Sequence, residues 1–145
     1  VFPYEPKTND EKFESVLQNL PNTILTPHIG GSTEEAQANI ADFVPTKIIT
    51  YLQRGNTLNS VNFPELQLPP VGDSHRLIHI HKNVPGIIAK INNILAEFDC
   101  NIVGQSLKTD EEIGYVITDV NKGYDKHLIE KLQNIENTIR LRILY

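Results

Sequence analysis

Hydrophobic and polar residues alternate regularly in the second half of the chain. Their spacing predicts strands over 75–81, 101–107, 113–120 and 139–144, and helices over 87–98 and 128–135. The order βαββαβ is typical of the ferredoxin-like fold, an antiparallel sheet with both helices on one face. About 70 residues close such a core only if a partner covers the sheet edge or the open face.

The apolar positions at the start of the chain predict shorter elements. Residues 1–9 are rich in proline and polar side chains, and the apolar residues of 10–20 predict a short helix that Pro21 ends. A brief strand is predicted over 23–26 and closed by Pro27. A proline therefore ends each of the two predicted elements.

A long helix is predicted next. Ser32 is placed to act as its N-cap, with Glu35 three residues later as the carboxylate of a capping box. Apolar residues follow at helical spacing until Gly55 ends the helix. Pro45 lies inside the helix and predicts a kink, because proline removes one backbone donor.

Residues 64–74 separate the two halves of the chain. They contain three prolines, a glycine and small polar residues, a composition typical of an extended connector between domains. We therefore predict a first part over 1–63, a linker or hinge over 64–74 and a second domain over 75–145.

Composition and charge narrow the class of protein. The 145 residues are 39% hydrophobic and 21% charged, which excludes a mostly disordered, collagenous or membrane-spanning chain. A net charge of -5 argues against a protein that grips nucleic acid. The single cysteine, Cys100, excludes an intrachain disulfide and favours an intracellular, cytoplasmic location.

Two residue patterns are missing from the chain. It contains no methionine, so we expect it to be a fragment of a longer protein. Its eight glycines include no three with G-x-G-x-x-G or P-loop spacing. The chain by itself is therefore not expected to contain a complete dinucleotide-binding fold.

The first candidate for chemistry is His28, which follows the strand predicted over 23–26 and precedes Gly30 and Gly31. Histidine titrates near neutrality and suits proton transfer, and glycines let a flat ring or a phosphate approach the backbone closely. These residues point to a catalytic site. In the alternative interpretation, His28 packs in a turn and the glycines only satisfy positive φ.

The second candidate lies where the strand predicted over 75–81 runs into a helix with Pro85 in its first turn. The backbone N–H groups of residues 86–88 are left unpaired and make an anion site that fits a carboxylate. His81 and Asn83 flank this site, so a small zwitterion such as an amino acid fits without metal or cofactor. In the alternative interpretation, Asn83 is only a helix cap.

A zinc site must also be weighed, because His79 and His81 lie on the same face of a strand. A third ligand is not near in sequence, and Cys100 lies at the far end of the following helix. Glu97 and Asp99 precede Cys100 with no nearby base, which argues against an activated thiolate. We therefore predict no metal site, and Cys100 as a core residue at a helix end.

Three segments together are specific enough to compare with a known family. They are Leu-Thr-Pro-His-Ile-Gly-Gly-Ser-Thr at 25–33, Ser-Val-Asn-Phe-Pro at 60–64 and His-Ile-His-Lys-Asn-Val-Pro-Gly at 79–86. Together they resemble the C-terminal part of the D-3-phosphoglycerate dehydrogenase family, of the type with one terminal ACT domain. The resemblance covers essentially the whole chain. It implies an α/β protein in which the tail of a Rossmann-type nucleotide-binding domain, residues 1–31, and a helix of the substrate-binding domain precede a ferredoxin-like ACT regulatory domain.

The resemblance implies that the whole protein oxidises 3-phosphoglycerate to 3-phosphohydroxypyruvate with NAD. His28 would be the general acid and base that takes the proton from the C2 hydroxyl, and Ile29, Gly30 and Gly31 would lie beside the nicotinamide. The family's substrate-binding arginine and histidine-orienting glutamate are expected to lie before Val1. The chain alone is therefore expected to be inactive.

For the ACT domain, the resemblance implies binding of L-serine, the end product of the pathway, between paired domains. The contacts would come from His81, Asn83, Val84, Pro85 and Gly86 of one protomer and from Asn101 of the other. Self-association would give a dimer, and a tetramer in the full protein. Residues 72–74, Gly-Asp-Ser, replace the family's Gly-Gly hinge, and this puts the size of the inhibition in doubt.

Two other functions stay open. The chain could be a binding module whose ACT domain senses an amino acid for some other activity, or a structural dimerisation domain with an empty interface. A G-x-G-x-x-G segment upstream in the gene would favour the dehydrogenase. None of the three functions is directed to nucleic acid or to a membrane.

Overall fold

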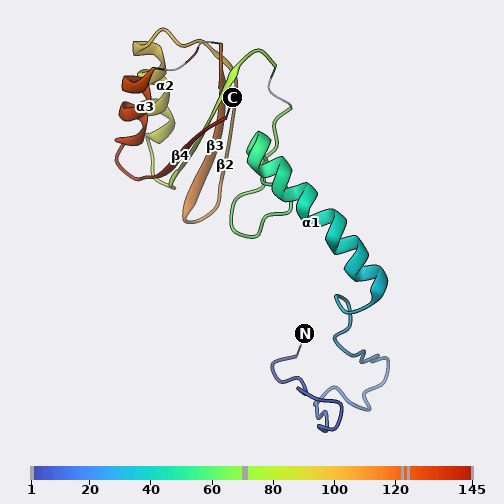
Figure 1. Ribbon diagram of the computed structural model, residues 1–145. Helices are drawn as coiled ribbons and strands as arrows, with labels where there is room; N and C mark the ends of the chain where they lie inside the picture. Colours follow the sequence, from blue (N-terminus) through green and yellow to red (C-terminus); the bar gives the residue numbers. More distant parts are fainter. Residues whose placement is uncertain (1, 70–71, 122, 124, 145) are drawn as a thin grey trace. The chain divides into compact units, whose positions relative to one another are not determined.

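The computed structural model describes residues 2–69, 72–121, 123 and 125–144 of the chain. Its contacts divide the chain into two compact units, Val1–Val44 and Pro45–Tyr145. The first helix, α1 (Glu34–Arg54), contributes residues to both units (Figure 1). The other helices and strands that the structure describes belong to the second unit.

The second unit contains an antiparallel sheet with two helices on one face (Figure 1). The strands are β1 (His75–Lys82), β2 (Ile102–Thr109), β3 (Ile113–Val120) and β4 (Thr138–Leu144), in the order β2-β3-β1-β4. Helix α2 (Ile87–Glu97) connects β1 to β2, and α3 (Lys126–Gln133) connects β3 to β4. The predicted βαββαβ order and ferredoxin-like fold are confirmed.

The main core lies between the sheet and helices α2 and α3. Successive strand residues point to opposite faces, so Leu77, His79 and His81 of β1 face the helices. The buried apolar residues of this core are Leu77, Ile87, Ile91, Leu95, Cys100, Val116, Val120, Leu128, Leu132 and Ile135. Cys100 is therefore the core residue that the sequence predicts.

The opposite face of the sheet is covered by the chain's own connector. This second core consists of Leu66, Ile78, Ile80, Tyr115 and Ile117, with Phe63, Leu68 and Leu144 packed against it. The Thr57 hydroxyl holds the connector, since it donates to the Pro64 carbonyl at 2.7 Å and accepts from the Leu66 N–H at 2.8 Å. The chain itself therefore covers part of the open face, and the expected partner at the sheet edge or on this face stays a prediction.

Part of the predicted connector packs on the sheet, whereas the sequence predicts an extended linker between domains. Leu66 is 9% exposed, because its side chain replaces water on the apolar sheet face. Pro70 and Val71, which also belong to the predicted linker, lie outside the described residues. The predicted domain boundary at 64–74 stays a prediction, and the contacts of the chain place that segment inside the second unit.

Gly55 follows the last residue of α1, as the sequence predicts. Its φ of +72° lies in the left-handed region that favours glycine. Its N–H donates to the Tyr51 carbonyl at 2.9 Å. A Cβ at this position would lie 2.9 Å from Cγ1 of Ile78, which is fully buried. The helix end and the sheet therefore approach each other too closely for any other residue.

The start of α1 differs from the prediction. Thr33, not Ser32, is the N-cap, because its Oγ1 accepts from the Ala36 N–H at 3.1 Å. Alanine stands three residues after Thr33, so the predicted capping box with Glu35 is wrong. The helix runs through Pro45 to its end, and the predicted kink stays a prediction.

Residues 10–20 and 23–26 form turns and irregular backbone instead of the predicted helix and strand. The N–H of Gln18 closes a turn on the Ser15 carbonyl at 3.1 Å, and Asn19 has a φ of +63°, which ends any helical run. Val16 is 92% exposed. A helix this short is marginal in water unless its apolar face is buried, which explains the wrong prediction.

Candidate functional sites

The loop between β1 and α2 keeps the helix start open. Gly86 is the N-cap residue of α2, with a φ of +91°, and as a glycine it has no side chain to cap the helix start. Asn83 donates instead across to the β2–β3 turn, from Nδ2 to the Asp110 carbonyl at 2.7 Å. The alternative that Asn83 is a helix cap is therefore wrong. The N–H groups of residues 86–88, which follow the exposed Val84 and Pro85, are therefore left for another acceptor.

His81 lies at the end of β1 and is 2% exposed. Its Nδ1 donates to the Lys82 carbonyl at 2.8 Å, since a carbonyl only accepts, so Nε2 is the ring nitrogen that can act as an acceptor. Nε2 is buried and has no hydrogen-bond partner among the described residues. The ring covers Gly114, where a Cβ would lie 2.6 Å from Nε2. The site therefore offers a buried acceptor beside an open helix start.

His79 lies beside His81 on the same face of β1, with the ring centroids 5.6 Å apart. Its Nε2 lies 2.9 Å from Thr138 Oγ1 and 3.3 Å from the Leu132 carbonyl. Burial lowers the pKa of His79 to about 4, and the neighbouring His81 adds to this effect. His79 is therefore neutral near pH 7.

The depressed pKa of His79 predicts a pH-dependent stability. Between the ordinary value of 6.5 and about 4, the unfolded chain binds a proton that the folded chain excludes. The free energy of unfolding should therefore fall by roughly 2–3 kcal/mol as the pH is lowered through this window. Urea unfolding of the chain and of His79→Gln at several pH values measures it. An equal slope in the two proteins over this window would contradict the prediction.

Asn101 lies at the opposite end of the sheet from His81. It precedes β2, whose first residue Ile102 pairs with Val120, whereas His81 pairs with Gly114. The strand from 114 to 120 separates these positions by roughly 20 Å. One chain therefore does not bring Asn101 to His81, and a site that uses both needs a second chain.

In the first unit, the side chain of His28 contacts Glu5. Nδ1 of the ring and Oε2 of the carboxylate are 2.9 Å apart. The Phe2 N–H, which bonds the same carboxyl group, and the His28 ring lower the pKa of Glu5. Both side chains line a cleft of about 570 Å³. A carboxylate at Nδ1 leaves Nε2 free to take or give a proton.

Glu5 is the residue that sequence reasoning missed. A glutamate that contacts His28 was expected to lie before Val1, and the structure shows that this expectation is wrong. The two residues are 23 positions apart, so no helical or strand spacing joins them. The sequence around Glu5 gives only a weak indication of this role, because it shows no more than a carboxylate followed by Pro6 in a proline-rich stretch.

Ile29, Gly30 and Gly31 form an exposed turn after the histidine. The N–H of Ser32 donates to the Ile29 carbonyl at 2.9 Å, and the Gln37 side-chain amide contacts the Gly31 carbonyl. A Cβ at either glycine would meet no atom within 4 Å. The space beside the turn is open, and the expected contact with a nicotinamide stays a prediction.

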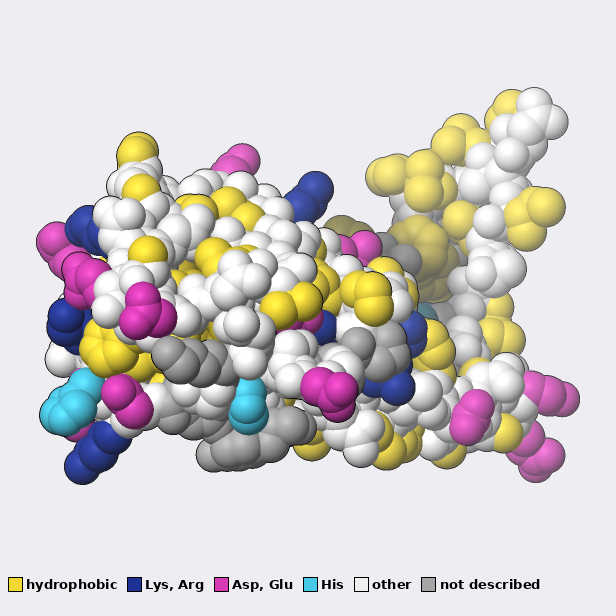
Figure 2. Space-filling view, turned by 90° about the horizontal axis from the view of Figure 1, so that it is seen from above, with side chains coloured by type: hydrophobic (Ala, Val, Ile, Leu, Met, Phe, Trp, Pro, Cys, Tyr) yellow, Lys and Arg dark blue, Asp and Glu magenta, His cyan; other side chains and the backbone are white. Residues whose placement is uncertain are grey.

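The described residues lack two further features, a metal-ligand cluster and a membrane-spanning helix. Among those residues, no three His, Cys, Asp or Glu side chains are grouped as a metal centre. No helix in the described part has the length and apolarity to cross a bilayer. On the face shown in Figure 2, acidic and basic side chains are interspersed. That His79 and His81 hold no metal stays a prediction.

The fold and a match to a protein-family model define the class of the second unit. Residues 77–140 match the model described as an AHAS small subunit-like ACT domain. These residues include β2, β3, α2 and α3 and parts of β1 and β4. The second unit therefore has an ACT-like ferredoxin fold.

The whole chain is homologous to D-3-phosphoglycerate dehydrogenases. It is 51% identical to the one from Haemophilus influenzae over 145 residues, and 47% identical to the one from Dictyostelium discoideum over 145 residues. Each match covers 100% of this chain and 35% of the relative. The chain thus spans about a third of the length of the curated relatives it matches. The family resemblance seen in its motifs is confirmed.

Proposed function

We propose that this chain is the part of an NAD-dependent D-3-phosphoglycerate dehydrogenase that carries the proton-transfer histidine and an L-serine sensor. The whole protein would oxidise 3-phosphoglycerate to 3-phosphohydroxypyruvate in L-serine biosynthesis. The observation that carries the proposal is 51% identity along the entire chain to a protein of that name.

His28 would take the proton from the C2 hydroxyl of 3-phosphoglycerate. Glu5 accepts from Nδ1 at 2.9 Å, so Nε2 is the ring nitrogen that would take the substrate's proton. Glu5 is in this role a positioning residue. NAD would supply the hydride acceptor, and its nicotinamide would lie against the open turn at Ile29, Gly30 and Gly31. The geometry of the described residues supports the proton-transfer pair alone.

A chimera tests this activity directly. In it, the chain replaces the matching segment of the Haemophilus influenzae protein, and NADH formation from 3-phosphoglycerate is followed by absorbance. We expect turnover, a loss of about 100-fold or more in kcat for His28→Gln, and at least about tenfold for Glu5→Gln. Glu14→Gln, which makes the same charge change on an exposed residue, should leave kcat unchanged.

Two results of the chimera experiment would count against the proposal. A folded chimera that binds NAD but does not oxidise 3-phosphoglycerate would leave the chain as an amino-acid-sensing module for some other activity. Full kcat in Glu5→Gln would show that the contact with His28 is only structural.

For the sensor, we propose that L-serine binds between the ACT domains of two protomers. Its carboxylate would bind the N–H groups of Gly86, Ile87 and Ile88, beside Val84 and Pro85, and His81 Nε2 would accept from the ligand. Asn83 would complete this half of the site. The partner's Asn101 would supply the other half, because roughly 20 Å separates it from His81 within one chain. Serine would inhibit by favouring one arrangement of the paired domains over another.

A further inference from the structure

The β2–β3 turn, residues 110–113, holds Asn83 at two points. The main-chain N–H of Asn83 donates to the Glu112 carbonyl at 2.8 Å, and its side-chain Nδ2 donates to the Asp110 carbonyl at 2.7 Å. A carbonyl only accepts, so the second contact fixes which way the amide group of Asn83 is turned. Nδ2 faces the turn, and Oδ1 is the atom that remains to accept from a ligand.

The carboxylate of Asp110 fixes the shape of this turn. Its Oδ1 accepts from the N–H of Glu112 at 2.9 Å and from the N–H of Ile113 at 2.7 Å. The N–H of Asp110 donates to the Ile113 carbonyl at 3.0 Å and closes the turn. Aspartate side chains stabilise turns in this way, by bonding the backbone two residues further on. The carbonyl that Asn83 bonds therefore belongs to a residue that is itself held by three hydrogen bonds.

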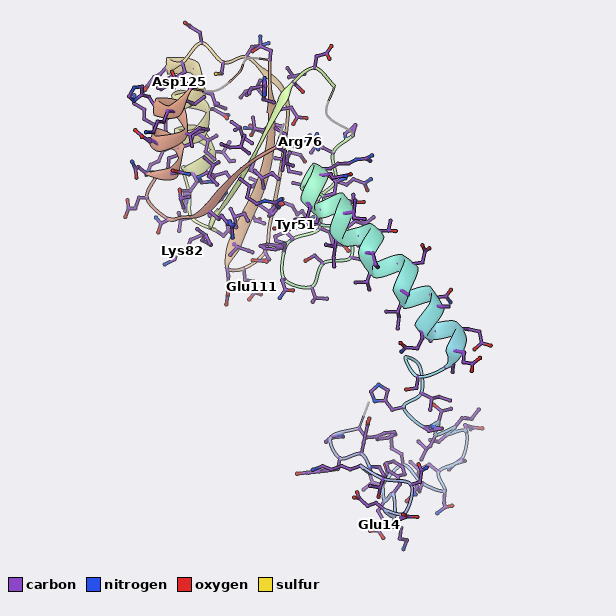
Figure 3. All side chains as sticks on the ribbon, viewed as in Figure 1. Glu14, Tyr51, Arg76, Lys82, Glu111 and Asp125 are labelled. Carbon is purple, nitrogen blue, oxygen red and sulfur yellow. The ribbon has the colours of Figure 1, made fainter. Side chains whose placement is uncertain are left out.

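The turn lies beside the buried acceptor of the proposed effector site. Lys82 follows His81 along β1 and pairs with Ile113, the first residue of β3. Figure 3 shows Lys82 and Glu111, which is in the turn, at the same end of the sheet. The His81 ring is 2% exposed, and its Nε2 has no hydrogen-bond partner among the described residues. Strand pairing therefore places His81, and the turn places the neighbouring Asn83.

We propose that Asp110 is a positioning residue of the effector site, which orients Asn83 through the β2–β3 turn. The inference rests on the proposed L-serine sensor. Asn83 is exposed, so a free side chain there would have several rotamers and would have to be ordered when the ligand binds. Its contacts with the turn order it beforehand. Asp110 acts through Asn83 and does not itself touch the effector.

Calorimetric titration of the 145-residue chain and of three variants with L-serine tests this role. We expect Asp110→Ala to weaken binding about fivefold, because Asn83 is then no longer ordered before the ligand arrives. Asp110→Asn keeps an oxygen that accepts from the same N–H groups, and should bind within about twofold of the unmodified chain. Glu111→Ala, at an exposed position of the same turn, should also stay within about twofold.

A double-variant cycle and an NMR signal separate positioning from a merely structural role. In an Asn83→Ala background, Asp110→Ala should change the affinity by less than about twofold, because the side chain that the turn orients is already absent. In the proton–nitrogen NMR spectrum without ligand, the side-chain amide of Asn83 should exchange with water faster in Asp110→Ala than in Asp110→Asn.

The outcomes separate the role of Asp110 from the sensor. Equal affinities of Asp110→Ala and the unmodified chain, or an equal loss with and without the Asn83 side chain, would overturn the inference and leave the sensor in place. A loss in Asp110→Asn as large as in Asp110→Ala would assign the effect to charge and overturn it as well. If the unmodified chain does not bind L-serine, the sensor proposal fails. An Asn83 amide signal that is the same in Asp110→Ala and Asp110→Asn would by itself reject ordering by the turn.

Discussion

Arg76→Met is expected to lower the free energy of unfolding of the second unit by about 3–5 kcal/mol. The substitution removes both donors to Asp119, whose side chain is only 11% exposed. An uncompensated carboxylate would then be buried beside the sheet, and the carbonyls of Arg54 and Pro69 would lose their partner. Urea unfolding followed by circular dichroism measures the change.

Two further variants isolate the buried charge as the cause. Arg140→Met makes the same change at an exposed position of the neighbouring strand β4 and should cost less than about 0.5 kcal/mol. Arg76→Met combined with Asp119→Leu removes both charges and should recover much of the loss. Two results would contradict this explanation. Arg76→Met would lower the free energy of unfolding by less than about 1 kcal/mol, or the double variant would be less stable than the single one.

Gly114→Ala is expected to weaken binding of L-serine at least about tenfold, because it displaces the His81 ring. The new Cβ would lie 2.6 Å from Nε2 and 2.9 Å from Nδ1. The ring is buried and its Nδ1 is bonded to Lys82, so it cannot move without losing that bond or its packing. Calorimetric titration of the variant with L-serine measures the effect.

Gly104→Ala is the matched control for this prediction. Gly104 also lies in a strand, but a Cβ there would make ordinary contacts of 3.8 Å with Leu68 and 3.9 Å with Asp119. Its affinity for L-serine should therefore match that of the unmodified chain. Equal affinities for Gly114→Ala and Gly104→Ala would show that the position of the His81 ring does not decide binding.

The second half of the fold was predictable because each of its strands and helices has a regular spacing of apolar residues. Each strand and helix places apolar residues on a face that the same unit buries, as Ile87, Ile91 and Leu95 do in α2. The apolar residues of 10–20 have the same helical spacing, but Val16 and its neighbours stay exposed. Periodicity predicts a helix only where tertiary packing then stabilises it.

The candidate sites were predictable in part for a similar reason. Gly86 and Asn83 follow a strand and precede a helix, so their place at the helix start can be read from neighbouring residues. Contacts between distant segments leave no such pattern. The Glu5–His28 contact spans 23 positions and the Tyr115–Gly55 bond spans 60. Both depend on irregular backbone or on the path of the connector, neither of which has a period.

The central claim is that this chain carries an L-serine sensor shared between two protomers, and a calorimetric titration with L-serine tests it most directly. D-serine and glycine serve as control ligands, and Asn101→Ala tests the half of the site on the partner. The account predicts saturable binding that is selective for L-serine and weakened by the substitution in a dimeric protein. A dimeric chain that releases no heat with L-serine, or that binds it equally well in Asn101→Ala, would contradict the account.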